Sequence, residues 1–200
     1  MRTQLSVLAA EDPSADKAVV TGSLGSETWR VILRRERPAD QAAVAAVHTA
    51  AFARPDTADV PEARLVDDLR HDGSVIPGLS IVATRDDEVI GHVVCSRGRV
   101  GGRACLGLGP IGVLPWHQRH GVGLALMHGV LAAADAFTEP AVVLLGDPGY
   151  YRRFGFVLAQ PLGLLPPDPG WAQHFQVRPL TGWDGSLRGT FRYAPAFDRL

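Results

Sequence analysis

The chain has 200 residues, of which 46% are hydrophobic, and its formal net charge is −1. This length supports one well-buried core, and the balanced charge gives no global field that would attract nucleic acid or an anionic membrane. Cys95 and Cys105 lack the spacing of metal ligands, so we expect free thiols, no metal and a cytoplasmic location. The apolar run Leu5–Ala10 is too short for a secretory or membrane-spanning segment.

The beginning of the chain differs in composition from the rest. Residues 1–28 are rich in Ala, Ser, Gly and Asp and show little periodicity, which predicts a flexible N-terminal extension. Within it, the segment Lys17–Thr21 is compatible with an extra strand. A single domain is expected over residues 29–200, and Trp29–Arg34 is its first predicted strand.

Helical and β-rich segments alternate after this strand. Asp40 and Pro61 mark the starts of two predicted amphipathic helices. Two β-rich segments flank the polar turn Asp86–Glu88 and predict a hairpin, and a further helix is expected after Gly121. This order predicts an α/β fold with a mixed sheet. The β-rich segments lie at Leu79–Thr84, Val89–Ser96, Ala104–Val113, Ala141–Leu145, Phe156–Leu158 and Phe175–Leu180.

The stretch from Leu106 to Gly123 carries the strongest functional signal. It combines an apolar strand, a turn with Pro115, and a basic, glycine-containing loop that leads directly into a helix. Free N–H groups and the helix dipole favour an anion at such a helix start, and glycine lets a phosphate approach the backbone closely. The stretch therefore predicts a phosphate site, although an ordinary strand–helix turn would show a similar pattern.

Two motifs resemble the GNAT superfamily of N-acetyltransferases. Gln118–Gly123 (Gln-Arg-His-Gly-Val-Gly) fits the family's Gln/Arg-x-x-Gly-x-Gly/Ala loop, and Tyr151–Phe156 resembles its Tyr-x-x-x-Gly-Phe segment. His120 departs from the Arg or Lys that is commoner at its position, and the strand before the loop lacks the Glu that often acts as base. More specifically, the chain looks like the YhbS-like branch, on three segments: Leu65–Arg70, Gly146–Tyr151 and Gly189–Tyr193.

The resemblance covers residues 29–200 and implies a fold and a co-substrate. The expected fold is α+β, with a mixed, mostly antiparallel sheet that is flanked by helices and splayed at its central parallel strand pair. The expected co-substrate is acetyl-CoA, held without a metal. Its pyrophosphate would lie on the N–H groups of residues 119–123, and its pantetheine arm along the strand backbone. The expected cofactor-binding residues are Ile111, Gly112, Val113, Gln118, Arg119, His120, Gly121, Val122 and Gly123.

Tyr151 matches the family position of the general acid. A phenol with a pKa of ~10 stays protonated at neutral pH and can donate to a leaving thiolate; the alternative is a packed ring with a hydrogen-bonded tip. Asp147 is a candidate base or substrate contact, and its alternative is a turn-forming residue before Pro148. His92 is a weaker candidate base, and its alternative is a satisfied histidine on a sheet face.

The acceptor is not specified by these motifs. Trp116, Trp171, Trp183 and Tyr193 are candidates for an acceptor pocket or, alternatively, local packing anchors. The acceptor would be a small-molecule amine or a peptide or protein amine, with no nucleic-acid or membrane partner, and a homodimer is compatible with such folds.

The leading functional hypothesis is an N-acetyltransferase that uses direct transfer in a ternary complex, because neither cysteine lies in a nucleophile motif. The alternative is a non-catalytic acyl-CoA-binding or sensing module. A nucleotide P-loop is disfavoured because Gly-Lys-Ser/Thr is absent.

Overall fold

The computed structural model describes residues 5–8, 17–24, 27–55 and 59–199. Within them one sheet of eleven strands forms, with the order β1-β2-β3-β4-β5-β6-β7-β10-β8, while β11 pairs with β5 and β9. The strands are β1 (Leu5–Leu8), β2 (Lys17–Leu24), β3 (Glu27–Arg35), β4 (Val75–Arg85), β5 (Glu88–Val100), β6 (Arg103–Val113), β7 (Ala141–Leu145), β8 (Val157–Leu158), β9 (Leu164–Leu165), β10 (Phe175–Pro179) and β11 (Gly189–Arg192).

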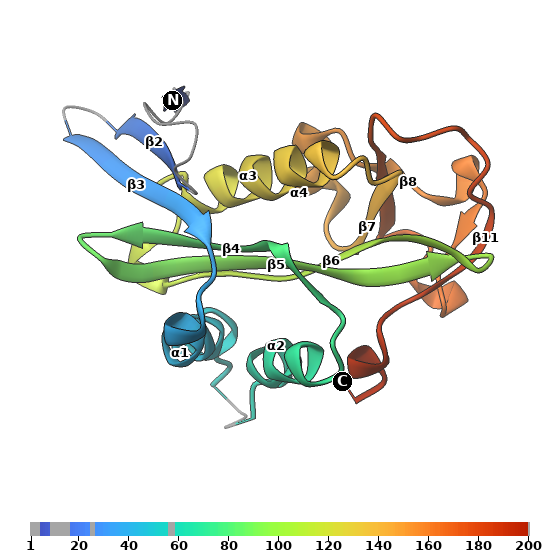
Figure 1. The fold of residues 1–200 in the computed structure, drawn as a ribbon, viewed down its shortest axis with the longest axis horizontal. Coiled ribbons are helices and arrows are strands. Elements are labelled where there is room, and N and C mark those ends of the chain that lie inside the picture. Colours follow the sequence, from blue (N-terminus) through green and yellow to red (C-terminus); the bar gives the residue numbers. More distant parts are fainter. Residues whose placement is uncertain (1–4, 9–16, 25–26, 56–58, 200) are drawn as a thin grey trace.

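Helices cover both faces of the sheet, with α1 and α2 on one side and α3 and α4 on the other (Figure 1). Each long helix turns an apolar stripe to the strands, since Val44 and Val47 of α1 and Leu126 and Met127 of α3 are buried. The α-helices are α1 (Gln41–Phe52), α2 (Pro61–His71), α3 (Val122–Ala136) and α4 (Pro148–Tyr151). Short 3-10 helices are η1 (Pro38–Asp40), η2 (Pro115–His117), η3 (Arg152–Phe154), η4 (Gln160–Leu162), η5 (Pro169–Trp171) and η6 (Pro195–Arg199).

The sheet is splayed at its central parallel pair. β6 and β7 pair only at Leu106↔Val142 and Gly107↔Val143, whereas β6 continues to Val113 and stays paired with antiparallel β5 on its other side. From Leu108 onward, the edge of β6 that faces β7 therefore has no strand partner among the described residues. The predicted mixed, mostly antiparallel fold with this splay is confirmed.

The described residues of the expected N-terminal extension form strands. β2 pairs with β3 along its whole length, and Val20 is buried, with 2% of its surface exposed. The strand considered at Lys17–Thr21 is therefore present, because pairing with β3 supplies hydrogen-bond partners that composition does not reveal. The expected boundary at residue 29 falls inside β3. Residues 1–4, 9–16 and 25–26 of the expected extension lie outside the described residues.

None of the helices in the described part of the chain is both long and apolar enough to cross a membrane.

Candidate functional site

A cavity of about 540 Å³ lies where the unpaired edge of β6 meets the start of α3. We call it the α3 cavity. Most of its lining comes from β6, the loop that follows and the first turn of α3, and the remainder from α1 and the α4–η3 segment. Its lining residues are Ala51, Phe52, Ile111, Gly112, Val113, Gln118, Arg119, Gly121, Gly123, Leu124, Tyr150 and Arg153. Of the residues expected to bind the cofactor, only His120 and Val122 are absent from this lining.

The end of β6 turns alternate backbone groups toward this cavity. Leu114 N donates to Ile90 O of β5 at 3.0 Å. Because the N–H and C=O groups of successive residues in a strand point to alternate sides, those of Gly112 also face β5, while those of Ile111 and Val113 face the unpaired edge. Val113 O already accepts a hydrogen bond from Gln118 Nε2 at 3.0 Å. The Gln118 side chain therefore ties the loop to the strand.

The start of α3 presents free backbone donors. Gly121 precedes the helix with a left-handed φ of 85°, which glycine adopts without strain. The first helical hydrogen bond runs from Ala125 N to Gly121 O at 2.9 Å, so the N–H groups of residues 122–124 have no acceptor within the helix. A Cβ placed on Gly123 would lie 3.5 Å from the Tyr150 hydroxyl, so the missing side chain leaves room above these donors.

Two arginines line the α3 cavity beside these donors, whereas the side chains of His120 and Val122 do not line it. Arg119 is exposed on the loop, and Arg153 places its guanidinium 4.8 Å from the centre of the Tyr150 ring while its Nε donates to Tyr150 O at 3.0 Å. The motif Tyr151–Phe156 contains Arg153, but nothing in that motif reveals that η3 faces the start of α3. His120 is exposed and Val122 is buried in the core.

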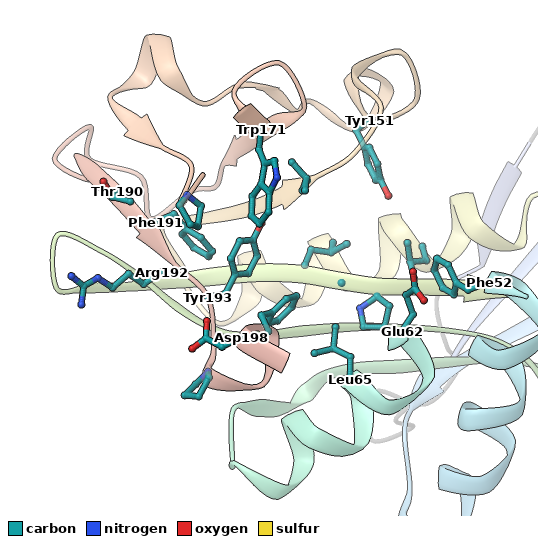
Figure 2. A pocket seen from close by; sticks show the side chains of 18 residues that line it. Phe52, Glu62, Leu65, Tyr151, Trp171, Thr190, Phe191, Arg192, Tyr193 and Asp198 are labelled. Atoms are coloured by element: carbon teal, nitrogen blue, oxygen red, sulfur yellow. The ribbon is translucent and has the colours of Figure 1, made fainter. Parts of the chain in front are cut away.

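A second cavity, of about 830 Å³, adjoins the first, since Phe52 and Ile111 line both. We call it the aromatic cavity, because six aromatic side chains from α1, α4, η5, β11 and the chain end line it (Figure 2). Trp171 and Tyr193, two of the four candidates for an acceptor pocket, are among them, whereas Trp116 and Trp183 line neither cavity. The six are Phe52, Tyr151, Trp171, Phe191, Tyr193 and Phe197.

The adjacent tyrosines Tyr150 and Tyr151 serve different cavities. Tyr150 lines the α3 cavity, while Tyr151 points its hydroxyl into the aromatic cavity (Figure 2). Burial raises the pKa of Tyr151 to about 12, so the phenol is protonated at neutral pH. A Cβ on Gly146 would overlap the Tyr151 ring; glycine there allows the ring to lie against the backbone.

Asp147 lies at the start of α4 and lines neither cavity. Its Oδ1 accepts a hydrogen bond from Gly149 N at 2.8 Å, and its side chain is exposed. This is the geometry of a helix-capping turn residue, which agrees with the alternative reading of Asp147.

A buried polar network lies behind Phe52, whose ring stacks on that of His48. Ser80 Oγ donates to Glu36, and His92 Nε2 lies 2.9 Å from that Oγ and 3.4 Å from Glu36 Oε2. Because a carboxylate only accepts hydrogen bonds, His92 Nε2 is the donor and its Nδ1 the acceptor. His48 Nε2, 2.8 Å from that Nδ1, then donates to it. His92 is thus a satisfied buried histidine.

This proton arrangement leaves His48 Nδ1 as a lone-pair acceptor with no hydrogen-bond partner within the described residues. A Cβ on Gly112 would lie 2.9 Å from this atom, so only glycine fits there. Burial lowers the pKa of His48 to about 3 and also lowers that of His92. Burial alone would raise the pKa of Glu36, but hydrogen bonds from His92 and Ser80 hold it at about 2. The network therefore carries two neutral histidines and one carboxylate.

Glu62 of α2 lines the aromatic cavity and was not singled out in the sequence. Its Oε1 lies 3.4 Å from Arg54 Nη2, and its Oε2 is buried with no hydrogen-bond partner within the described residues. No motif marks this residue, since its role depends on where α2 packs.

Comparison with known proteins assigns the chain to a family. Residues 44–156 match the acetyltransferase (GNAT) family, and the chain belongs to it. The family and the acetyltransferase class predicted from the sequence are thus confirmed. The uncharacterized N-acetyltransferase YhbS of Escherichia coli (strain K12) is 40% identical over 131 residues, which span 64% of this chain and 76% of YhbS. The uncharacterized N-acetyltransferase YjhQ of the same organism is 30% identical over 141 residues, with coverage of 66% and 78%.

Two solved structures are similar over most of both chains. The crystal structure of Escherichia coli YhbS in complex with CoA has a TM-score of 0.79 and 33% identity, and the match covers 89% of this chain and 97% of YhbS. A GNAT family acetyltransferase from Brucella melitensis in complex with acetyl-CoA has a TM-score of 0.70 and 35% identity, and the match covers 84% and 98%.

Proposed function

We propose that this chain transfers the acetyl group of acetyl-CoA to an amine, by direct transfer in a ternary complex. The observation that carries the proposal is the meeting of two cavities at Phe52 and Ile111. The α3 cavity would hold the donor, and the aromatic cavity would hold the acceptor amine. The CoA and acetyl-CoA bound by the two similar structures support this assignment of the donor.

The α3 cavity suits the anionic part of the donor. The pyrophosphate would accept hydrogen bonds from backbone N–H groups of residues 119–123, where the helix dipole adds partial positive charge. Arg119 and Arg153 add two full charges at the same opening. Gly121 and Gly123 keep side chains away from these donors.

The open edge of β6 suits the pantetheine arm. Its amide groups would pair with the backbone of Ile111 and with the N–H of Val113 in the manner of an added strand, since Val113 O already accepts from Gln118. Ile111 also borders the aromatic cavity, so the thioester would arrive at the junction of the two cavities.

Tyr151 would act as the general acid at this junction. The uncharged amine attacks the thioester carbonyl carbon and forms the C–N bond, and sulfur keeps the electron pair as the C–S bond breaks. Tyr151 gives its phenolic proton to that sulfur and regains a proton from the nitrogen as the amide forms. Since its raised pKa keeps it protonated at neutral pH, Tyr151 would hold this proton until the sulfur leaves.

Direct transfer is supported by the state of the two cysteines. Cys95 and Cys105 are free thiols buried in the core, and burial raises the pKa of Cys105 to about 12 and that of Cys95 as well. Neither is a thiolate at neutral pH, and the thiolate is the nucleophilic form. Two free thiols also suit a reducing cytoplasm, which the proposal includes as the location.

Calorimetry and thiol release test the proposal. We expect acetyl-CoA and CoA to bind, ATP to bind much more weakly, and at least one member of an amine panel to release thiol from acetyl-CoA. The panel would contain aromatic amines, polyamines, amino acids and lysine peptides. Failure to bind acetyl-CoA contradicts the proposal. Binding without thiol release from any acceptor favours a non-catalytic acyl-CoA-binding module.

A further inference from the structure

We infer that the acceptor is a small primary amine whose ammonium group pairs with Glu62 and whose aromatic body fills the aromatic cavity. The inference rests on the proposed function, since it names the acceptor for that same transfer. Four features of the cavity carry it: an unpartnered carboxylate, the charges around it, the aromatic lining, and the volume.

The first feature is the carboxylate of Glu62. Its side chain is three-quarters buried, with 24% of its surface exposed, and Oε2 has no hydrogen-bond partner among the described residues. Arg54 reaches only Oε1, at 3.4 Å, and its own side chain is 66% exposed, so this ion pair contributes little. A buried carboxylate oxygen without a donor costs free energy. Oε2 is closed to solvent in this conformation, so a bound cation with N–H donors would offset that cost once the Glu62 side chain turns Oε2 toward the cavity.

The second feature is the balance of charge around the cavity. Its lining holds two carboxylates, Glu62 and Asp198, and one cation, Arg192. Asp198 and Arg192 are exposed at the rim, and Arg192 points away from the cavity in Figure 2. The charge that faces the bound molecule is therefore negative. This disfavours an acidic acceptor and favours a cationic one.

The third feature is the aromatic lining. Tyr193 stands edge-on to Phe191 and lies against Phe197, with ring centres 4.6 Å apart in both pairs. These contacts hold the three rings together in one wall of the cavity, and Figure 2 places Tyr193 across the cavity from Glu62. Ring faces attract a cation and also bury an apolar body, so an amine with an aromatic group would gain from both ends of the cavity.

The fourth feature is size and direction. A cavity of about 830 Å³ falls within the range of roughly 300–1,000 Å³ that is usual for small-molecule sites, and an amine without a body would leave most of it empty. In Figure 2 Glu62 lies beside Phe52, and the Tyr151 hydroxyl points toward them from the opposite side. An ammonium on Glu62 would thus lie near the junction with the α3 cavity, where the thioester would arrive. Loss of one proton to solvent would then give the uncharged amine that attacks the thioester.

The test is calorimetric titration of 2-phenylethylamine into the protein saturated with CoA. We expect it to bind at least about tenfold more tightly than 2-phenylethanol, ethylamine or 3-phenylpropanoate. The first of these compounds lacks the ammonium group, the second lacks the aromatic ring, and the third carries a negative charge instead. Glu62→Gln should weaken the binding of 2-phenylethylamine by about 10- to 100-fold. Glu88 is an exposed glutamate that lines neither cavity. The matched control Glu88→Gln should therefore leave the affinity for 2-phenylethylamine unchanged.

Folding of the variant is checked by its affinity for acetyl-CoA, which Glu62→Gln should retain. Should that variant fail to fold, Trp171→Ala at the exposed rim provides a second arm, with an expected loss of about fivefold for 2-phenylethylamine. Equal binding of 2-phenylethanol, or unchanged affinity in the folded Glu62→Gln variant, would overturn the inference.

The outcome for the proposed function is read separately. Thiol release with a polyamine or a peptide, but neither binding nor acetylation of 2-phenylethylamine, contradicts the Glu62 inference and leaves the acetyltransferase standing. Absence of acetyl-CoA binding contradicts the proposed function itself. Acetylation of 2-phenylethylamine, with the predicted loss in Glu62→Gln, supports both.

Discussion

The α3 cavity and the aromatic cavity meet at Phe52 and Ile111 but are built in different ways. The α3 cavity takes most of its lining from one stretch, residues 111–124, and offers backbone donors and arginines. The aromatic cavity collects side chains from residue 52 to residue 198 and offers rings and one inward carboxylate. The first depends on local backbone geometry and the second on packing. Substitutions can therefore change the acceptor cavity while the donor cavity stays intact.

Tyr151→Phe should have the largest effect of the substitutions considered, and it should act through the aromatic cavity alone. The variant loses the proposed proton donor of the aromatic cavity, so kcat should fall about 100-fold, or about 2.7 kcal/mol. The affinity for acetyl-CoA should stay within about twofold, measured by calorimetry, because only Tyr150 lines the α3 cavity. Tyr150→Phe is the matched control and should retain most of the turnover. An unchanged kcat in Tyr151→Phe, with the cognate amine, would remove the catalytic role.

Gly123→Ala should affect the other cavity. The added methyl group meets only ordinary contacts, 3.5 Å from the Tyr150 hydroxyl and 3.8 Å from Val113, and alanine favours the helix. The melting temperature should therefore be equal or slightly higher. The same methyl fills the space over the helix donors, so the affinity for acetyl-CoA should fall about tenfold, or about 1.4 kcal/mol. Unaltered affinity would show that the donor does not approach this turn.

The buried histidines should make stability depend on pH without involving either ligand. In the unfolded chain His48 takes up a proton near pH 6.5, whereas in the folded chain its pKa is about 3. Stability is thus complete above pH 6.5 and declines as the pH falls toward 3. Between pH 7 and 5.5 the loss from His48 should be about 1 kcal/mol, measured by urea unfolding.

His48→Gln tests the cause of this pH dependence. The variant should lose about 1 kcal/mol of the stability change between pH 7 and 5.5. The control His174→Gln should keep the wild-type change, because the His174 ring is exposed in the folded chain. An identical pH profile in His48→Gln would contradict the burial argument.

Arg153→Gln should have the smallest effect. Its guanidinium lies at the opening of the α3 cavity and packs over the Tyr150 ring. Removal of its charge should therefore weaken the binding of acetyl-CoA about threefold at low salt. The difference should shrink at high salt, since the group is exposed to solvent. A salt-independent loss would point to a packing role over the Tyr150 ring instead. Affinity for 2-phenylethylamine should not change.

The elements and the donor motif were largely predictable from the sequence. The helices that begin beside Asp40, at Pro61 and after Gly121 follow from apolar periodicity and from Pro61 in a first turn, which are local properties. Asp40 does not cap α1 with its side chain, because its carboxylate pairs with Arg34 and accepts a hydrogen bond from Arg37 N. The N-terminal strands were less predictable, because β2 depends on pairing with β3, and that pairing appears only in the sheet. Arg153 was visible in the sequence but not placed, since its position depends on how α4 and η3 fold back toward α3.

The sequence by itself determined the family and the class of donor site. The strand, the left-handed Gly121 and the free N–H groups of α3 lie within a few residues of one another, so their geometry is a local property of the backbone. Only the tertiary structure decided the acceptor cavity and the protonation of the buried network. Glu62, Trp171 and Tyr193 meet because three distant segments pack together, and the neutrality of His48 arises from desolvation by its neighbours. Packing and desolvation depend on the whole fold, and no short motif records them.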